Sequence, residues 1–319
     1  MRSRRLILHI GTQKTGSTSL QKLLDERRES LLADGVLYAS TRRGFKHKHL
    51  ARAARKADLS ARDALMAEFD ASGAHTLVVS DEAFWRASAD APVAFFAPLR
   101  ETLRIEVVVY LRRPDLYIES LYKQTLRTGR EDEQRDIAAF WRSDEIRGRL
   151  DYASLLQTWS TVADALHVFD FAREVKARGL VRSFFEGLSL DVAEVPEDRV
   201  EHRSPDGQWA LAMRQARALG LPLPGALLER VSLLAEAQPG FAPTRHLLGR
   251  RERQALLDHC APELERLRER HGLAFSAALP ADEPEDMAVA ADSGYLLRLL
   301  QVLCERVPER ALPPKRALD

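Results

Sequence analysis

Residues 11–18, with the sequence GTQKTGST, combine two glycines, a lysine and four hydroxyl side chains in eight positions. A short apolar run precedes them and leucines at helical spacing follow, which is the strand–turn–helix context that a phosphate-binding loop requires. In such a turn the backbone N–H groups converge on an anion, and the dipole of the following helix adds to the attraction. These residues therefore predict a phosphate-binding loop.

The lysine of this loop is not where an ordinary nucleoside triphosphatase has it. The spacing of Gly11 and Gly16 is that of a Walker A loop, but Ser17 stands at the position of the usual lysine. Lys14 lies inside the loop instead. An ordinary metal-dependent ATPase would lack its main cation here. The alternative for the loop taken alone is a glycine-containing turn that binds nothing.

A second group of polar residues follows the strongest predicted strand, residues 105–111 with the sequence IEVVVYL. Arg112 comes directly after this segment, and Ser120 lies eight residues later on a helix that Pro114 begins. Open α/β sheets bind their ligands at the carboxyl ends of the strands, where Arg112 is expected. A guanidinium at that place and a hydroxyl on the next helix can bind one phosphate together.

The two segments, IGTQKTGSTSLQ at 10–21 and YLRRPDLYIESLYKQ at 110–124, resemble the cofactor-binding motifs of a known family. The family is that of the sulfotransferases that use PAPS, 3′-phosphoadenosine 5′-phosphosulfate, and the resemblance is to its bacterial type with a P-loop-like fold. Both motifs, their spacing and their order match. The resemblance covers residues 5–24 and 105–126, with a looser agreement of strand order up to residue 187. The helical C-terminal third matches no family in this way.

The resemblance implies a role for each matching residue. The loop residues that it places at the cofactor are Thr12, Gln13, Lys14, Thr15, Gly16, Ser17 and Thr18, the last five of them at the 5′-phosphosulfate. It places Arg112 and Ser120 at the 3′-phosphate. Ser204, in HRSPDG, is assigned to the later loop that closes over the nucleotide, although the basic–glycine pair often found there is absent. In this scheme Lys14 is the catalytic cation and no metal takes part.

Transfer to an acceptor hydroxyl needs a general base within hydrogen-bond reach of the hydroxyl proton, and the family uses histidine or glutamate. Glu82 follows the predicted strand 76–80, so we expect it at the carboxyl edge of the sheet, beside the phosphate loop. Its alternative role is to favour the first turn of a helix by its charge. The competing candidates are His49 and His47, in the basic stretch 42–56, where their alternative role is that of solvated loop residues.

The elements that must position these residues alternate between strands and helices. Apolar runs predict strands at 5–10, 35–38, 76–80, 105–111 and 166–171. Helical spacing predicts helices that start at 17 and 49, others at 60–71, 114–128, 179–187, 205–219, 224–237, 249–270 and 290–307, and helical stretches within 133–159. Such alternation is typical of a parallel sheet that helices cover on both faces.

We therefore predict an α/β fold with three layers, α/β/α, that is P-loop NTPase-like, with a central parallel sheet of about five strands and a helical C-terminal extension. A length of 319 residues is enough to bury a sizeable core without disulfides. One sulfotransferase α/β domain is expected over 1–280, with a PAPS-binding core at 5–190 and a helical part at 205–280. Residues 281–319 are expected to hold a linker, a C-terminal helix and a tail.

The composition is globular and gives no sign of nucleic-acid binding. Lys and Arg number 48 against 47 Asp and Glu, a formal net charge of +1. Residues 1–56 carry fourteen basic and four acidic side chains, an excess of ten, which suits an anion site. Cys260 and Cys304 lack metal-ligand spacing, and no stretch approaches the ~18 apolar residues of a membrane span. We expect a cytoplasmic protein without a stable membrane anchor; its oligomeric state is left open.

The function that these expectations describe is transfer of a sulfuryl group from PAPS to an acceptor hydroxyl. On the analogy of the family, the acceptor is a small molecule or a glycan, with a carbohydrate or glycolipid hydroxyl favoured. One alternative is a small-molecule kinase with a deviant phosphate loop, which would need a Mg²⁺ site. The other is a nucleotide-binding module that has kept the fold without catalysis.

Overall fold

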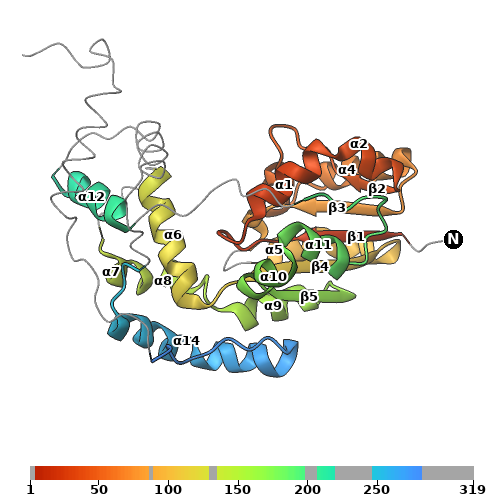
Figure 1. Ribbon diagram of the computed structural model, residues 1–319. Helices are drawn as coiled ribbons and strands as arrows, with labels where there is room; N and C mark the ends of the chain where they lie inside the picture. The colour runs from red at the N-terminus through yellow and green to blue at the C-terminus, as the bar shows by residue number, and fades with distance from the viewer. Residues whose placement is uncertain (1–3, 86–88, 129–134, 198–206, 220–245, 282–319) are drawn as a thin grey trace, which may run out of the picture. The chain divides into compact units, whose positions relative to one another are not determined.

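Five parallel strands form one sheet in the part of the chain that the structure describes. The structure is a computed structural model, and it describes residues 4–85, 89–128, 135–197, 207–219 and 246–281 (Figure 1). The strands are β1 (Arg5–His9), β2 (Val36–Tyr38), β3 (Thr76–Ser80), β4 (Arg104–Leu111) and β5 (Ala165–Asp170). They lie in the order β2-β3-β1-β4-β5, and every neighbouring pair is parallel. The predicted parallel sheet is confirmed.

The central strand of this sheet is β1, which carries the predicted phosphate loop at its carboxyl end. Leu6 pairs with Leu77 of β3 on one side and with Ile105 of β4 on the other. After β1 the chain forms β2 and β3, which lie on one side of β1. It then forms β4 and β5, which lie on the other side of β1. In open α/β sheets, the carboxyl end of a strand at such a reversal is where ligands bind.

Helices fill the connections between the strands. They are α1 (Ser17–Glu26), α2 (Arg28–Ala33), α3 (Lys48–Arg55), α4 (Leu59–Ser72), α5 (Asp90–Phe96), α6 (Pro114–Thr128), α7 (Ile137–Trp141), α8 (Asp144–Arg147), α9 (Tyr152–Ser160), α10 (Phe171–Arg178), α11 (Leu180–Gly187), α12 (Gly207–Ala218) and α14 (Arg250–His271), with 3₁₀ turns η1 (Glu82–Phe84) and η2 (Ala97–Glu101). The predicted elements that fall on described residues agree with these within two residues. The helix expected from residue 17 onward divides into α1 and α2, and helices α5 and α10 were not predicted. The helices expected at 224–237 and 290–307 lie outside the described residues.

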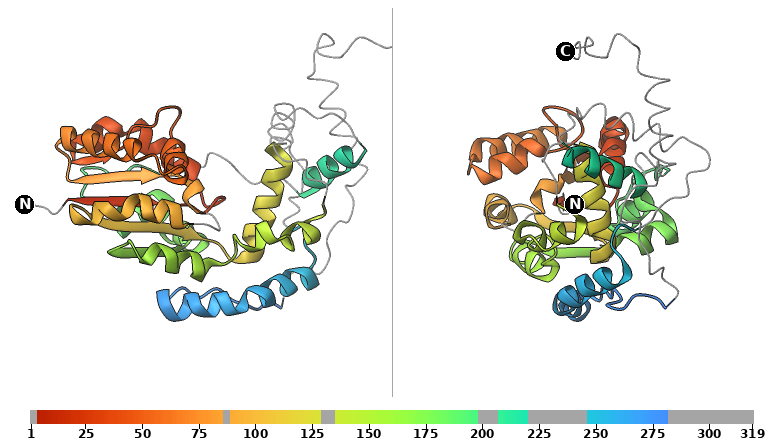
Figure 2. Two further views of the ribbon diagram at one scale, coloured as in Figure 1. Left: turned by 180° about the vertical axis from the view of Figure 1, so that it is seen from behind. Right: turned by 90° about the vertical axis from the view of Figure 1, so that its left-hand side faces the viewer.

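Helices cover both faces of the sheet, as the right-hand view of Figure 2 shows for the strands and the helices around them. On one face a buried cluster joins the strands to α1, α2 and α11. It contains Ile7, Val36, Tyr38, Val78, Val108 and Tyr110 from the strands and Leu20, Leu23, Leu24, Leu31, Leu180, Val181, Phe184, Phe185, Leu188 and Leu190 from the helices and the turn after α11. Side chains alternate along a strand, so the equally buried Leu6, Leu8, Leu77 and Val79 face the opposite layer. The three-layer α/β/α prediction is confirmed.

The chain folds as two compact units, each built from several segments. The first contains Met1–Tyr117, Ser143–Arg203 and Leu256–Ala278, and the second contains Ile118–Arg142, Ser204–Ala255 and Leu279–Asp319. The sheet and the predicted phosphate loop belong to the first unit, and most of α6 together with α7 and α12 belongs to the second. The predicted domain boundary at residue 280 stays a prediction, because residues 282–319 lie outside the described part.

A buried carboxylate organises the second unit. Glu119, on α6, accepts hydrogen bonds of 2.7 Å from the backbone N–H groups of Leu247 and Leu248, just before α14. Burial raises the pKa of Glu119 to about 7, while Lys123, the two N–H donors and Arg253 act in the opposite direction. These contacts fix the start of α14 to α6. Among the described helices, none is both long enough and apolar enough to cross a bilayer.

Candidate functional site

The loop between β1 and α1 is shaped by three residues with positive φ. Gly11 has a φ of 106°, Lys14 of 67° and Gly16 of 71°. The left-handed region costs an ordinary residue such as Lys14 roughly 1–2 kcal/mol, and strained residues of this kind cluster at ligand sites. Gly16 precedes the first residue of α1 and gives it no side-chain cap. The N–H groups of Ser19 and Leu20 donate to the carbonyl oxygen of Gly16, so those of Ser17 and Thr18 are the ones for which an anion can be the acceptor.

Three hydroxyls of the loop stabilise its shape from within. Thr12 donates to the carbonyl oxygen of Tyr110 at 3.1 Å, and Thr15 and Ser17 donate to the carbonyl oxygen of Thr12 at 2.7 and 3.1 Å. All three side chains are buried. In this conformation the hydroxyls hold the turn together, and the cofactor contacts predicted for them stay predictions.

The remaining loop residues are less deeply buried. Lys14 is half-buried at the tip of the loop. Gln13 accepts a hydrogen bond of 3.3 Å from Arg149, which lies between α8 and α9. Thr18, in the first turn of α1, accepts one of 3.4 Å from the ammonium of Lys46. Basic side chains from two other segments thus reach the loop beside Lys14.

Gly16 is required by space as well as by backbone conformation. A Cβ at this position would lie 2.4 Å from Cδ2 of Leu180 and 3.4 Å from Cε2 of Phe171. Gly73 has nearly the same backbone angle, with φ 67°, but a Cβ there would meet no described atom within 4 Å. Alanine at either position would have the same backbone strain, but only alanine at Gly16 would also crowd a neighbouring side chain.

We expect Gly16→Ala to lower the free energy of unfolding by about 1–3 kcal/mol more than Gly73→Ala, since overpacking adds to the shared strain. Urea denaturation of the two variants measures this difference. Equal losses in both would mean that Leu180 moves aside without cost and that the loop is not packed as described.

Arg112 lies beside the loop, directly after β4. Its Nη1 donates to the carbonyl oxygen of Lys14 at 3.2 Å, and its guanidinium stacks on the ring of Phe171 at 5.1 Å. Its Nε is buried and makes no hydrogen bond to any described residue. Burial lowers the pKa of Arg112 from its usual value, but guanidinium groups stay charged in proteins. A buried guanidinium with unused donor capacity next to a phosphate loop is suited to an anionic ligand.

The other two residues predicted to bind the nucleotide are Ser120 and Ser204. Ser120 is buried on α6, in the second unit, eight residues after Arg112. Ser204 lies outside the described residues. That Arg112 and Ser120 bind the 3′-phosphate together stays a prediction.

Glu82 lies at the carboxyl edge of the sheet against the phosphate loop, the place at which it was expected. It begins η1 directly after β3, and a Cβ on Gly11 would lie 3.2 Å from its Cβ. Both of its carboxylate oxygens pair with the Lys46 ammonium, at 3.0 and 3.2 Å, and the side chain is only 13% exposed. The preceding Asp81 caps η1 by accepting from the N–H of Ala83. Glu82 thus lies in the first turn of η1 and also contacts the edge of the phosphate loop.

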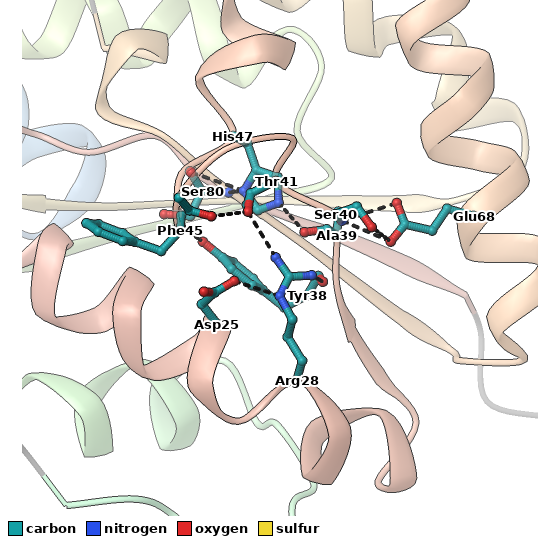
Figure 3. A network of polar contacts seen from close by, with 11 residues as sticks. Asp25, Arg28, Tyr38, Ala39, Ser40, Thr41, Phe45, His47, Glu68 and Ser80 are labelled. Carbon is teal, nitrogen blue, oxygen red and sulfur yellow. Dashed lines mark hydrogen bonds and ion pairs between the residues drawn. The ribbon is translucent and has the colours of Figure 1, made fainter.

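His47 is used by the fold, which weakens it as a candidate base. Its Nε2 lies 2.7 Å from the carbonyl oxygen of Ala39, and its Nδ1 lies 2.9 Å from the N–H of Ser80 (Figure 3). Burial lowers the pKa of His47 to about 4. With both ring nitrogens held by backbone groups, His47 has none left for an acceptor proton. His49 is half-exposed, and burial together with the charge of Arg42 lowers its pKa. Its role as a base stays a prediction.

Two partners at this site were not predicted from the sequence. Lys46 pairs with Glu82 across 36 residues, and Arg149 contacts Gln13 across 136. Lys46 lies in the basic stretch 42–56, which was assigned to an anion site only as a whole. Across the described ranges, no three His, Cys, Asp or Glu side chains come together as a metal-binding group.

No family model matches the chain, and no curated protein matches it in sequence. The crystal structure of a sulfotransferase from Alicyclobacillus acidocaldarius superposes with a TM-score of 0.53 at 15% identity, over 86% of this chain and 98% of that one. The chain has the fold of that sulfotransferase. At this identity the likeness concerns the fold alone.

Two further solved structures are less similar. The sulfotransferase domain from the curacin biosynthetic pathway has a TM-score of 0.35 at 12% identity, over 82% of this chain and 98% of that one. The PezAT toxin–antitoxin system of Streptococcus pneumoniae contributes a chain with a TM-score of 0.30 at 11% identity, over 69% of this chain and 88% of that one. Neither score is high enough to support an argument about this chain.

Proposed function

We propose that this protein transfers a sulfuryl group from PAPS to a hydroxyl of a small molecule or glycan in the cytoplasm, a carbohydrate or glycolipid being the favoured acceptor. The observation that carries the proposal is the meeting of three groups around one loop. Lys14 lies within the loop, Arg112 donates to the carbonyl oxygen of Lys14, and Glu82 lies against Gly11. A cation, an anion-binding guanidinium and a carboxylate are the groups that this chemistry needs.

The residues of the loop fit a bound phosphosulfate. The uncapped start of α1 offers N–H groups, Lys14 offers a charge, and the buried Nε of Arg112 has no hydrogen-bond partner among the described residues. Glycine at positions 11 and 16 lets the chain turn tightly there. Backbone donors, a lysine and an arginine around a glycine-containing turn are a typical anion-binding set.

In the proposed reaction PAPS supplies an activated sulfuryl group. Glu82 accepts the proton of the acceptor hydroxyl while the hydroxyl oxygen forms its bond to sulfur. Lys14 stabilises the electron pair that remains on the bridging phosphate oxygen when the bond from that oxygen to sulfur breaks. The products are the sulfated acceptor and 3′,5′-adenosine bisphosphate, so that Glu82 gains one proton in each turnover and releases it to solvent.

The proposal predicts which nucleotide stabilises the protein. At a hundred times its Kd, 3′,5′-adenosine bisphosphate adds about 2.7 kcal/mol to the free energy of unfolding, a rise in Tm on the order of 5 °C for a chain of this size. Thermal melts without metal measure this shift, with Mg-ATP as the comparison. A shift with Mg-ATP and none with the bisphosphate would favour the kinase alternative and contradict the proposal.

A further inference from the structure

The turn from β2 to α3, residues 39–47, is held by polar contacts near both of its ends (Figure 3). At its start, the backbone N–H and hydroxyl of Ser40 donate to Glu68 at 2.9 and 2.7 Å. Near its end, the hydroxyl of Tyr38 donates to the carbonyl oxygen of Phe45 at 2.7 Å. The backbone N–H of His47 donates to the carbonyl oxygen of Ser80 at 3.1 Å. The turn is thereby attached to α4, β2 and β3.

Lys46 lies between two residues of this turn that are held by hydrogen bonds. Phe45 is fixed by Tyr38, and His47 is fixed through its backbone and both ring nitrogens. A lysine side chain normally has about 2 kcal/mol of rotamer entropy to lose on being ordered. Anchoring its backbone on both sides confines the range of the ammonium before any ligand binds.

The ammonium of Lys46 touches both sides of the candidate site. It contacts the two oxygens of Glu82 at 3.0 and 3.2 Å and the hydroxyl of Thr18, in the first turn of α1, at 3.4 Å. The side chains of Lys46 and Glu82 are 32% and 13% exposed. Contact with both oxygens restricts rotation of the Glu82 carboxylate, and the contact with Thr18 restricts movement of the ion pair away from the phosphate loop. An exposed ion pair would do neither and would contribute about 0–1 kcal/mol.

We propose that Lys46 is a positioning residue that orients the Glu82 carboxylate toward the acceptor. This inference rests on the proposed function and adds a residue to it. Lys46 acts through Glu82, so it need not touch either substrate. The fastened turn 39–47 is the structural reason why the orientation is fixed, and His47 serves that turn rather than the chemistry.

The test compares Lys46→Met with Lys46→Arg and with Lys56→Met, an exposed lysine of the same basic stretch that loses the same charge. We expect Lys46→Met to lower kcat by about 10–100-fold, since small misplacements of a catalytic group have effects of that order. The Kd for 3′,5′-adenosine bisphosphate should change less than about threefold. Lys46→Arg should recover most of kcat, because a guanidinium can also bind both carboxylate oxygens. Lys56→Met should match the wild type.

A double-mutant cycle separates positioning from a merely structural role. If Lys46 acts through Glu82, adding Lys46→Met to Glu82→Gln costs no further activity. Additive losses, or a loss of nucleotide affinity with kcat unchanged, would overturn the proposal. Lys46→Gln serves in the same cycle if the methionine variant does not fold. Wild-type protein that neither binds the bisphosphate nor transfers a sulfuryl group would refute the proposed function itself, and that result appears before any variant is made.

Discussion

Lys14→Ala is expected to lower kcat by about 10²–10³-fold while the fold survives, since one well-placed electrostatic donor is worth that much. Lys14 would act on charge that grows only as the phosphate leaves, so its loss should fall on kcat more than on KM. The residue is half-buried at the tip of the loop, and its left-handed backbone tolerates alanine no worse than lysine. Steady-state kinetics with PAPS as donor measure the effect.

The matched control for this variant is Lys176→Ala, on the exposed side of α10. It removes the same charge from an exposed position that is not part of the loop and should keep wild-type kcat. A Lys14→Ala variant that retains more than about a third of the wild-type rate would show that the loop lysine does not carry the charge stabilisation.

Glu82→Gln should lower kcat by about 10²–10⁴-fold and leave the affinity for the nucleotide product nearly unchanged. The substitution keeps the size and polarity of the side chain but removes its basicity. Glu82 lies against the loop at Gly11 without belonging to it, so the fold and the anion site should persist. Kinetics and calorimetric binding of 3′,5′-adenosine bisphosphate, run on the same preparation, separate the two effects.

Two further variants accompany this prediction. Glu101→Gln, at an exposed residue of η2, removes a charge far from the chemistry and should be fully active. If Glu82→Gln stays active while His49→Ala loses activity, the base lies in the basic stretch. That outcome would contradict the role given to Glu82 and the role given to Lys46 together.

The strands could be predicted because parallel strands are buried on both faces and therefore appear as apolar runs. Thr76–Ser80 has no exposed residue, and its bounds follow from the sequence alone. Helix α10 could not be found in this way. None of its residues is fully buried, so the apolar period that marks a buried helix face is weak there. Asp170 marks the start of α10, because its carboxylate accepts from the N–H groups of Ala172 and Arg173 as a helix cap. The same residue also ends strand β5, and the sequence shows only the strand.

The sequence could predict those residues of the candidate site that are recognised within a single segment of the chain. The loop lysine, Arg112 at a strand end and Glu82 at the neighbouring strand end follow from motif spacing and from the rule that ligands bind at the carboxyl edge. The pairing of Lys46 with Glu82 depends on the path of the turn 39–47, which no local pattern encodes. The same turn decides that the ring of His47 faces backbone groups and is unavailable as a base. Contacts of this kind require the folded geometry.

The most direct test of the central claim is transfer of label from PAPS carrying a radioactive sulfur, offered with a panel of hydroxyl-bearing sugars and glycolipids. We predict label in an acceptor, release of 3′,5′-adenosine bisphosphate in equal amount, and loss of both in Lys14→Ala. A second reaction with γ-labelled ATP and Mg²⁺ should leave the same acceptors unlabelled. Label from ATP with none from PAPS would contradict the account, as would transfer from PAPS that persists undiminished without Lys14.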